Sequence, residues 1–292
     1  MTDLVLAVEA TLSRVLGGQV RIEQRVRLAG GSISHTERLD TTAGSFVLKF
    51  HETPPPGFFR AEADGLTALR QSGTSLVIPR VIAYEDVAPS FLLTEFLSEG
   101  RRQSDFDEQL GRGLAELHRT TAPQFGFAED NYCGATPQPN AWRERWVDFY
   151  AHARLGYQLG LASAGGLLAA VEIVRVRRLV ERLGDWLNEP ETGPALIHGD
   201  LWSGNLHTDC LGRPALIDPA AYYGHPEAEL GMMTLFGGFS ARTFAAYDEA
   251  FALEPGWRER NPLYQLYHLM NHLNLFGASY RAQVMAVVDR FV

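Results

Sequence analysis

Cysteine is scarce in this sequence, with Cys133 and Cys210 the only two among 292 residues. Neither lies at a spacing typical of metal ligands, so we expect no zinc site and no disulfide framework, which suits a reducing cytoplasm. Long apolar runs are also missing, since the longest, residues 159–171, is too short to span a membrane and contains a glycine pair. The start, Met1-Thr-Asp-Leu4, lacks the basic and apolar parts of a signal peptide. We therefore expect a soluble, cytoplasmic protein with no membrane partner.

Basic residues are outnumbered by acidic ones, and the net charge at pH 7 is −9. This charge argues against a nucleic-acid partner, because a phosphate backbone requires a basic face. It does not exclude a nucleotide, which needs only a local basic site and a metal ion. Hydrophobic residues make up 46% of the chain and charged residues 21%, as in a globular protein. No heptad pattern points to a partner helix, so we expect a monomer.

The segment Leu196–Asn205, followed by Ile217-Asp218-Pro219, contains the strongest chemical signal. It reads as an apolar strand, an acid (Asp200) on a tight turn, and an amide (Asn205), after which a short hairpin delivers Asp218. Protein kinases place their catalytic base, a metal-binding amide and a metal-binding Asp in the same order, with the same spacing from base to amide. Asp200 is therefore the candidate base, and Asn205 and Asp218 are candidate ligands of magnesium, which prefers oxygen donors. Solvated turn residues are the structural alternative.

The hydrophobic pattern divides the chain into two parts. Residues 3–16 and 59–69 have helical spacing, whereas residues 20–50, 77–84 and 90–96 read as strands. Beyond residue 97 the pattern is mostly helical, with helices predicted at 106–118, 141–161 and 167–187. The motif and this pattern together predict an α+β, two-lobed protein-kinase-like fold. Its β-rich N-lobe, residues 1–96, would bind the nucleotide, and its mainly helical C-lobe, residues 97–292, would hold the catalytic and substrate-binding residues.

A cleft of this kind needs groups that cover and orient the phosphates of ATP. Lys49 ends an apolar strand, as the phosphate-binding lysine of kinases does, and Glu62 on the next helix is its expected ion-pair partner rather than Asp64. Glycine lets backbone N–H groups approach phosphate oxygens, although an ordinary turn is the alternative at such a site. The candidate cover is Gly30, Gly31 and Ser32, and the candidate adenine-binding connector, placed by topology, is Glu95, Phe96 and Leu97.

Several motifs together resemble one known family. Within the segment His198–Asn205, the His198-Gly-Asp200 triplet followed by Asn205 is an element of aminoglycoside and choline kinase-like proteins. Trp202, with Thr136-Pro-Gln-Pro-Asn140 and Phe236-Gly-Gly-Phe239, narrows the resemblance to the fructosamine kinases, also called ketosamine 3-kinases. It extends over most of the chain, from Gly30 to Phe276.

The resemblance implies ATP- and magnesium-dependent phosphorylation of the sugar 3-hydroxyl of ketosamines. The unstable product then loses its sugar, so that the amine is deglycated. Carried over by position, Asp200 is the base, Asn205 and Asp218 hold magnesium, and Lys49 with Glu62 orients phosphate. Glu229 is one departure, because relatives often have Asp there, and it puts only a supporting contact in doubt.

The acceptor side is predicted from a tryptophan and a polar-aromatic helix. Trp202 is a candidate wall for the ketose or its amine, and a core residue that supports the loop is the alternative. His272 is the candidate substrate contact, and a structural histidine bonded to a carbonyl is the alternative. Residues 136–140 are expected to form a rigid loop between helices that shapes the acceptor side.

Two other functions remain open. Another small-molecule kinase of this fold would act on an aminoglycoside or choline, and a polycationic aminoglycoside would call for an acidic pocket. A non-catalytic nucleotide-binding protein should have lost one of four residues, all of which are present: Lys49, Asp200, Asn205 and Asp218.

Overall fold

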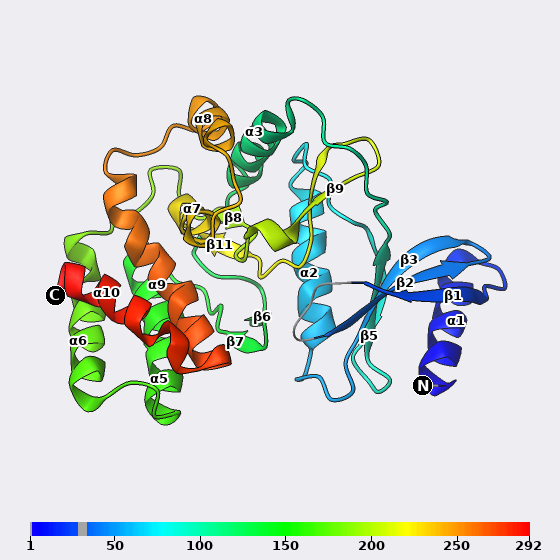
Figure 1. The fold of residues 1–292 in the computed structure, drawn as a ribbon, viewed down its shortest axis with the longest axis horizontal. Helices are drawn as coiled ribbons and strands as arrows, with labels where there is room; N and C mark the ends of the chain where they lie inside the picture. Colours follow the sequence, from blue (N-terminus) through cyan, green and yellow to red (C-terminus); the bar gives the residue numbers. More distant parts are fainter. Residues whose placement is uncertain (1, 29–33) are drawn as a thin grey trace.

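The computed structural model describes residues 2–28 and 34–292, so Gly30, Gly31 and Ser32, the predicted phosphate cover, lie outside the described residues. A sheet-rich lobe at the N-terminal end lies beside a helical lobe that contains the C-terminus (Figure 1). This arrangement confirms the predicted two-lobed α+β fold. The boundary at residue 96 stays a prediction, and the chain there is a connector between a strand that ends at Glu95 and a helix that begins at Phe106.

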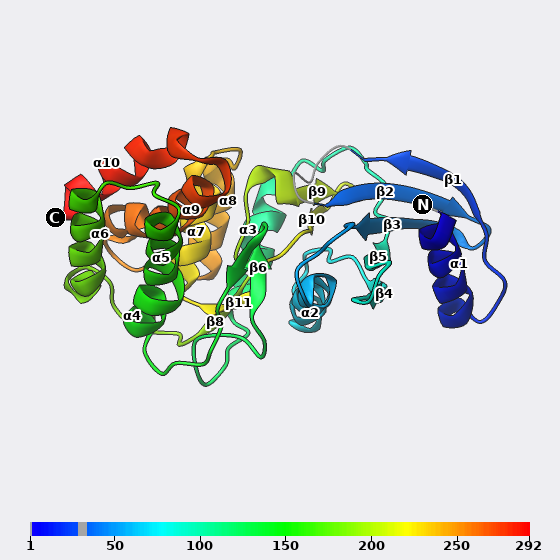
Figure 2. The ribbon, with the colours of Figure 1, turned by 90° about the horizontal axis from the view of Figure 1, so that it is seen from below.

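The N-terminal lobe is built on one antiparallel sheet with the strand order β1-β2-β3-β5-β4. Along β5 the side chains alternate, so that Phe91 and Leu93 pack with α1 while Leu92 packs with α2. The two helices therefore cover opposite faces of the sheet (Figure 2). The elements of this lobe are α1 (Thr2–Leu16), β1 (Ile22–Arg27), β2 (His35–Thr41), β3 (Gly44–Phe50), α2 (Phe58–Gln71), β4 (Val81–Glu85) and β5 (Phe91–Glu95).

Helix α2 connects the two lobes. Its buried face, which includes Leu66, shares one hydrophobic core with Leu110 and Leu114 of α3 (Phe106–His118), a helix whose bounds the sequence predicts. Gly65 permits the close approach of α2 to the catalytic region, because a Cβ at this position would lie 3.3 Å from Pro219. Glu62 is therefore held on a helix that is packed on both sides.

The C-terminal lobe is mainly helical, and its short strand pairs lie on the side that faces the sheet lobe (Figure 1). No described helix is long and apolar enough to cross a membrane. The strand pairs are β6 (Asn131–Cys133) with β7 (Thr136–Gln138), β8 (Ala195–Ile197) with β11 (Tyr222–Gly224), and β9 (Leu206–Thr208) with β10 (Pro214–Leu216). The remaining helices are α4 (Trp146–Phe149), α5 (Tyr157–Ala164), α6 (Ala170–Glu181), α7 (Pro226–Leu235), α8 (Ala241–Ala250), α9 (Trp257–Phe276) and α10 (Arg281–Phe291).

Two predicted elements are wrong. The pattern predicts a helix over 141–161, but the helix begins at Trp146 and passes through a π-helix, Tyr150–Gly156, before α5. The π-helix contains the fully buried Arg154, whose guanidinium lies 3.9 Å from the ring centroid of Tyr222 and donates to the Pro139 carbonyl. Residues 136–138 form strand β7 instead of a loop between helices. Their partner strand is short and irregular in composition, so no local periodicity marks the pair.

His225 at the start of α7 is a buried histidine with a structural role. Its Nδ1 accepts the backbone N–H of Glu227 at 3.1 Å, and its ring packs beside the rings of Trp146 and Tyr264. Burial, assisted by Arg260, lowers the pKa of His225 to about 3. The ring therefore stays neutral in the folded protein at pH values where an exposed histidine is charged.

We expect the substitution His225→Asn to reduce the acid sensitivity of folding. Below pH 6.5 the unfolded chain protonates His225 and the folded chain does not, so the unfolded state binds more protons and stability falls as pH falls. Asn keeps an N-cap acceptor and removes the titration. Between pH 6.5 and 5 the natural chain should lose about 2 kcal/mol more than the variant. Urea unfolding at both pH values measures this difference, and equal losses would contradict the assignment.

Candidate active site

The catalytic loop begins where β8 ends and requires a glycine. Gly199 has a φ of 81°, and a Cβ there would lie 2.2 Å from the carbonyl oxygen of Ala220. The same approach allows the Ala220 N–H to donate to the His198 carbonyl at 2.9 Å. The segment that contains Asp200 is thereby fixed against the segment that follows Asp218.

His198 connects these two segments through its ring. Its Nε2 lies 2.9 Å from the Ile217 carbonyl, and its Nδ1 lies 3.3 Å from the backbone N of Asp200. A neutral ring protonated on Nε2 satisfies both contacts. Burial lowers the pKa of His198, which favours this neutral form.

Glu229 on α7 holds the loop from behind. Its side chain is fully buried, and its carboxylate accepts the N–H groups of His198 at 2.5 Å and Gly199 at 3.2 Å. The longer Glu side chain thus reaches both donors, so the supporting contact that the sequence put in doubt is present. His118 lies behind Glu229: its Nε2 is 3.9 Å from the Glu229 carboxylate and its Nδ1 is 2.7 Å from the Tyr247 hydroxyl.

Asn205 and Asp218 lie next to each other, as the spacing predicts. The Nδ2 of Asn205 contacts the Asp200 carbonyl at 2.9 Å, the Asp200 Oδ2 at 3.4 Å and the Asp218 carbonyl at 3.4 Å. All three contacts use Nδ2, so the amide oxygen is left as a ligand. Asp218 has a φ of 57°, and among the described residues no other non-glycine residue has a positive φ. The donor set of an amide oxygen and a carboxylate fits magnesium, which binds through few protein oxygens.

Lys49 joins the two lobes at this point. From β3, its ammonium contacts Glu62 of α2 at 2.5 Å and also the Oδ1 of Asp218. Asp64, the alternative partner, makes no ion pair with Lys49. Burial alone would lower the pKa of Lys49, but the charges of Asp218 and Glu62 outweigh it and raise the pKa. The lysine therefore stays a cation, as a phosphate-orienting group must.

Asp200 lies in an environment that strengthens it as a base. Burial first, and then the negative charges of Asp218 and Glu229, raise the pKa of Asp200 well above its ordinary value, while Asn205 opposes the shift. A carboxylate with a raised pKa accepts a proton from a hydroxyl more readily. One side of the carboxylate remains accessible, since the side chain is 21% exposed.

The connector after β5 is held at both ends. The N–H of Glu95 donates to the Arg80 carbonyl at 2.9 Å, and the Leu97 carbonyl lies 2.9 Å from the Nε2 of His207. Phe96 lies under the guanidinium of Arg38, 5.4 Å from its ring centroid. Because His207 occupies the Leu97 carbonyl, the backbone groups left for an adenine edge are fewer than the topology suggests. The adenine-binding role of Glu95, Phe96 and Leu97 stays a prediction.

Trp202 is positioned on the surface of the catalytic loop. Its indole is 41% exposed and covers Gly204, where a Cβ would lie 2.3 Å from the ring. A tryptophan buried in the core would not show this exposure, so the position agrees with a wall of the acceptor site. Gly238, with a φ of 93°, packs on the same loop, because a Cβ there would lie 2.5 Å from the Cβ of Ser203.

We expect the substitution Gly204→Ala to weaken acceptor use while leaving ATP use unchanged. The added methyl group must displace the indole of Trp202, and an aromatic contact contributes about 0.5–1.5 kcal/mol. The KM for the acceptor should therefore rise about 2- to 12-fold. Steady-state ADP release with each substrate varied in turn measures the change. Gly160→Ala, on α5 with no atom close to a new Cβ, is the matched control, and equal increases in both KM values would show that Trp202 only supports the loop.

His272 lies on α9 within a group of aromatic rings. Its Nδ1 is 2.8 Å from the His268 carbonyl, and its ring centroid lies 5.0 Å from that of Phe236, 5.4 Å from Phe276 and 5.1 Å from Tyr280. This contact with a backbone carbonyl is the one expected of a histidine with a structural role, the alternative to a substrate contact. Burial lowers the pKa of His272, so its ring is neutral. Its role as a substrate contact stays a prediction.

The β6–β7 hairpin supports the segment after Asp218. The Nε2 of Gln138 donates to the Ala220 carbonyl at 3.1 Å and to Asn131 at 2.8 Å, while Asn131 donates to the Ala221 carbonyl at 2.8 Å. Both side chains are buried. Residues 136–140 therefore hold the catalytic backbone, a role that the prediction of an acceptor-side loop did not include.

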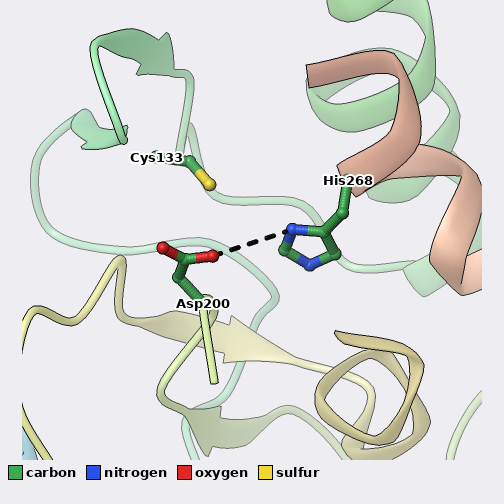
Figure 3. Close-up of side chains that lie close together, drawn as sticks. All are labelled: Cys133, Asp200 and His268. Carbon is green, nitrogen blue, oxygen red and sulfur yellow. Dashed lines mark ion pairs between the residues drawn. The ribbon is translucent and has the colours of Figure 1, made fainter. Parts of the chain in front are cut away.

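Sequence reasoning missed one further feature. Cys133 on β6 and His268 on α9 lie beside Asp200 (Figure 3). The three residues are far apart in the sequence and share no motif, so only the folded chain brings them together.

The fold and these residues define a two-lobed protein of the protein-kinase-like class. The sequence model of the fructosamine kinase family matches residues 4–292. The chain belongs to the fructosamine kinase family, which confirms the resemblance found in the sequence.

Individual relatives span nearly the whole chain. A protein of Synechocystis sp. named as a probable ketoamine kinase is 40% identical over 96% of this chain and 94% of its own. The chloroplastic protein-ribulosamine 3-kinase of Arabidopsis thaliana is 36% identical over 94% of this chain and 85% of its own. A crystal structure from Thermobifida fusca named for a fructosamine-3-kinase has a TM-score of 0.87 at 33% identity, covering 97% of this chain and 98% of its own. An aminoglycoside phosphotransferase, at 17% identity and a TM-score of 0.61, shares the fold.

Proposed function

We propose that this chain transfers the γ-phosphoryl group of ATP to the 3-hydroxyl of a ketosamine and so begins the deglycation of the amine. The observation that supports this function most directly is the convergence of Asp200, Asn205, Asp218 and Lys49 between the lobes. Membership of the fructosamine kinase family, and relatives named as ketoamine kinases and ribulosamine 3-kinases, support the substrate class.

In the proposed reaction, Asp200 accepts the proton of the acceptor hydroxyl as that oxygen attacks the γ-phosphorus. The new O–P bond forms as the bond between the γ-phosphorus and the bridging oxygen breaks, and ADP leaves. Lys49, held by Glu62, provides positive charge at the phosphates. Magnesium, held by Asn205 and Asp218, would neutralise charge on the transferring group. The remaining contribution is positioning, since His198, Gly199 and Glu229 fix the base.

The test is ADP release with magnesium-ATP and a panel of four acceptors: ribulosyl-lysine, fructosyl-lysine, choline and kanamycin. We expect turnover with the two ketosamines alone. Turnover with choline or kanamycin would keep the kinase fold and overturn the substrate class. Nucleotide binding without turnover of any acceptor would contradict the proposed activity.

A further inference from the structure

Two side chains beside Asp200 have no part in the proposed reaction. Cys133 lies at the end of β6 and His268 on α9, and both side chains lie beside the carboxylate of Asp200 (Figure 3). The Nδ1 of His268 lies 4.0 Å from the Oδ1 of Asp200. One sulfur, one nitrogen and one oxygen atom of the three residues lie within 4.8 Å of one another. The other oxygen of Asp200, Oδ2, faces Asn205.

The His268 ring is buried without a partner for the nitrogen that faces this cluster. Its side chain is only 5% exposed, and its Nδ1 has no hydrogen-bond partner among residues 2–28 and 34–292. An unsatisfied buried polar atom destabilises the folded state, so a ligand that pairs with it is favoured. Cys133, by contrast, is held in place, because the Nδ2 of Asn271 lies 3.2 Å from its carbonyl and 3.4 Å from its Sγ.

The donor set matches a thiophilic metal ion rather than magnesium. Zinc binds Cys, His and Asp at about 2.0–2.3 Å, so tetrahedral ligand atoms lie about 3.3–3.8 Å apart. The nitrogen and oxygen atoms, 4.0 Å apart, would have to approach by about 0.7 Å, and the pairs that include the sulfur, no more than 4.8 Å apart, by at most about 1.3 Å. A zinc ion held by three protein ligands has its fourth coordination position open to the solvent. Here the open side is that of Asp200, which is partly exposed.

We propose that Cys133, Asp200 and His268 bind a thiophilic divalent cation such as Zn²⁺, and that the bound ion inhibits the enzyme at its acceptor side. The Cys133 thiol loses its proton to the solvent as the S–Zn bond forms, and His268 donates the lone pair of Nδ1. The coordinated Asp200 can no longer accept the proton of a hydroxyl. The inhibition, which rests on the proposed role of Asp200 as the base, competes with the acceptor and not with ATP. The three ligands come from distant segments of the chain, so the sequence shows no cysteine and histidine spacing typical of a zinc site.

The first experiment measures metal binding without nucleotide, acceptor or turnover. Equilibrium dialysis with Zn²⁺ should give one ion per chain, and Co²⁺ in its place should give the absorption of a sulfur–cobalt bond. Cys133→Ser and His268→Gln should each lower the affinity at least 10-fold, while Cys210→Ser, which changes the exposed thiol, should not. No binding, or equal binding by the Cys133→Ser variant, would overturn the site. These outcomes do not depend on the proposed activity.

The second experiment tests the inhibition. The free Zn²⁺ concentration in the ADP-release assay is fixed with a metal buffer, because ATP itself binds Zn²⁺. At fixed free Zn²⁺, the apparent KM for the ketosamine should rise, and an excess of magnesium-ATP should not relieve the inhibition. The Cys133→Ser variant should retain turnover without zinc and lose the sensitivity to zinc. Zinc that binds at the site without changing turnover, or inhibition that ATP relieves, would overturn the inhibitory role.

A separate observation concerns the basic residues. The chain has 26 lysine and arginine residues in total. Lys49 is the only lysine, and all the others are arginines. Reducing sugars form ketosamines on unprotonated primary amines, whereas a guanidinium is charged at all ordinary pH values. The side chain of Lys49 is 12% exposed and held by two carboxylates.

We infer that the side chains of the folded chain resist glycation by reducing sugars. On the proposed function, these are the sugars whose amine adducts the enzyme removes. The test is incubation with ribose, followed by peptide mass spectrometry. The folded chain should form no side-chain adduct, while the urea-unfolded chain should form one at Lys49. A variant with Arg112→Lys, Arg145→Lys and Arg178→Lys, all exposed positions, should form adducts at the new lysines. Glycation of Lys49 at equal rates in the folded and unfolded chains would overturn the inference, whatever the activity of the protein.

Discussion

The substitution Asp200→Asn is expected to reduce phosphoryl transfer to a ketosamine by about 10²- to 10⁴-fold, the usual contribution of a positioned base. Asn is close in shape to Asp and can still contact Asn205, but it cannot accept the proton of the hydroxyl. The binding of ATP should change little, because the groups assigned to the phosphates remain. ADP release measures the first effect, and equilibrium dialysis with labelled ATP measures the second.

A matched control is available on the same hairpin. Asp209 is also buried, but it accepts the N–H groups of Leu211 and Arg213 in the turn between β9 and β10. The substitution Asp209→Asn should therefore lower stability and leave kcat within a few fold. If Asp200→Asn retained turnover to the same extent, Asp200 would not be the base.

The substitution Lys49→Met is expected to lower kcat by about 10²- to 10³-fold, the usual cost of removing one preorganised donor that stabilises charge in the transition state. Met retains the length of the side chain and removes the ammonium that contacts Glu62 and Asp218. Without this cation, the carboxylates of Glu62 and Asp218 lose the positive charge that pairs with both of them. Activity should fall and ATP should bind more weakly.

The control for Lys49→Met is another ion pair of the same sheet. Arg25 pairs with Glu37 at 2.6 Å, and this ion pair does not include Lys49, Glu62 or Asp218. Arg25→Met should leave kcat and the affinity for ATP unchanged. A similar loss in both variants would show that Lys49 acts through the stability of the sheet, and circular dichroism of each variant separates these effects.

Local patterns predicted the hairpin that carries Asp218 well, whereas the catalytic roles of its residues stay predictions. The spacing of Asp200, Asn205 and Asp218 is a property of one short segment, in which β8, β9 and β10 follow each other with few intervening residues. The choice of Glu62 over Asp64 also succeeded, because helical geometry decides which of the two faces the sheet. The bounds of α3 came from its regular apolar spacing.

Features that depend on distant segments could not be predicted in this way. Residues 136–138 form a strand because Asn131 and Gln138 bond to each other and to the backbone after Asp218. The predicted strand over residues 77–84 begins only at Val81. Val77 instead forms an isolated β-bridge with Ala215 of β10. The meeting of Cys133 and His268 at Asp200 has the same origin, since only tertiary packing determines it.

The most direct test of the central claim is to identify the product. The chain is incubated with magnesium-ATP and fructosyl-lysine labelled with ¹³C at C3, and phosphorus and carbon NMR spectra are followed with time. We expect a phosphate ester on the 3-oxygen, seen as coupling of phosphorus to the labelled carbon, followed by the appearance of free lysine as the sugar is lost. A phosphate on another hydroxyl, or no phosphorylated ketosamine while ATP is consumed, would contradict the assignment of this chain as a ketosamine 3-kinase.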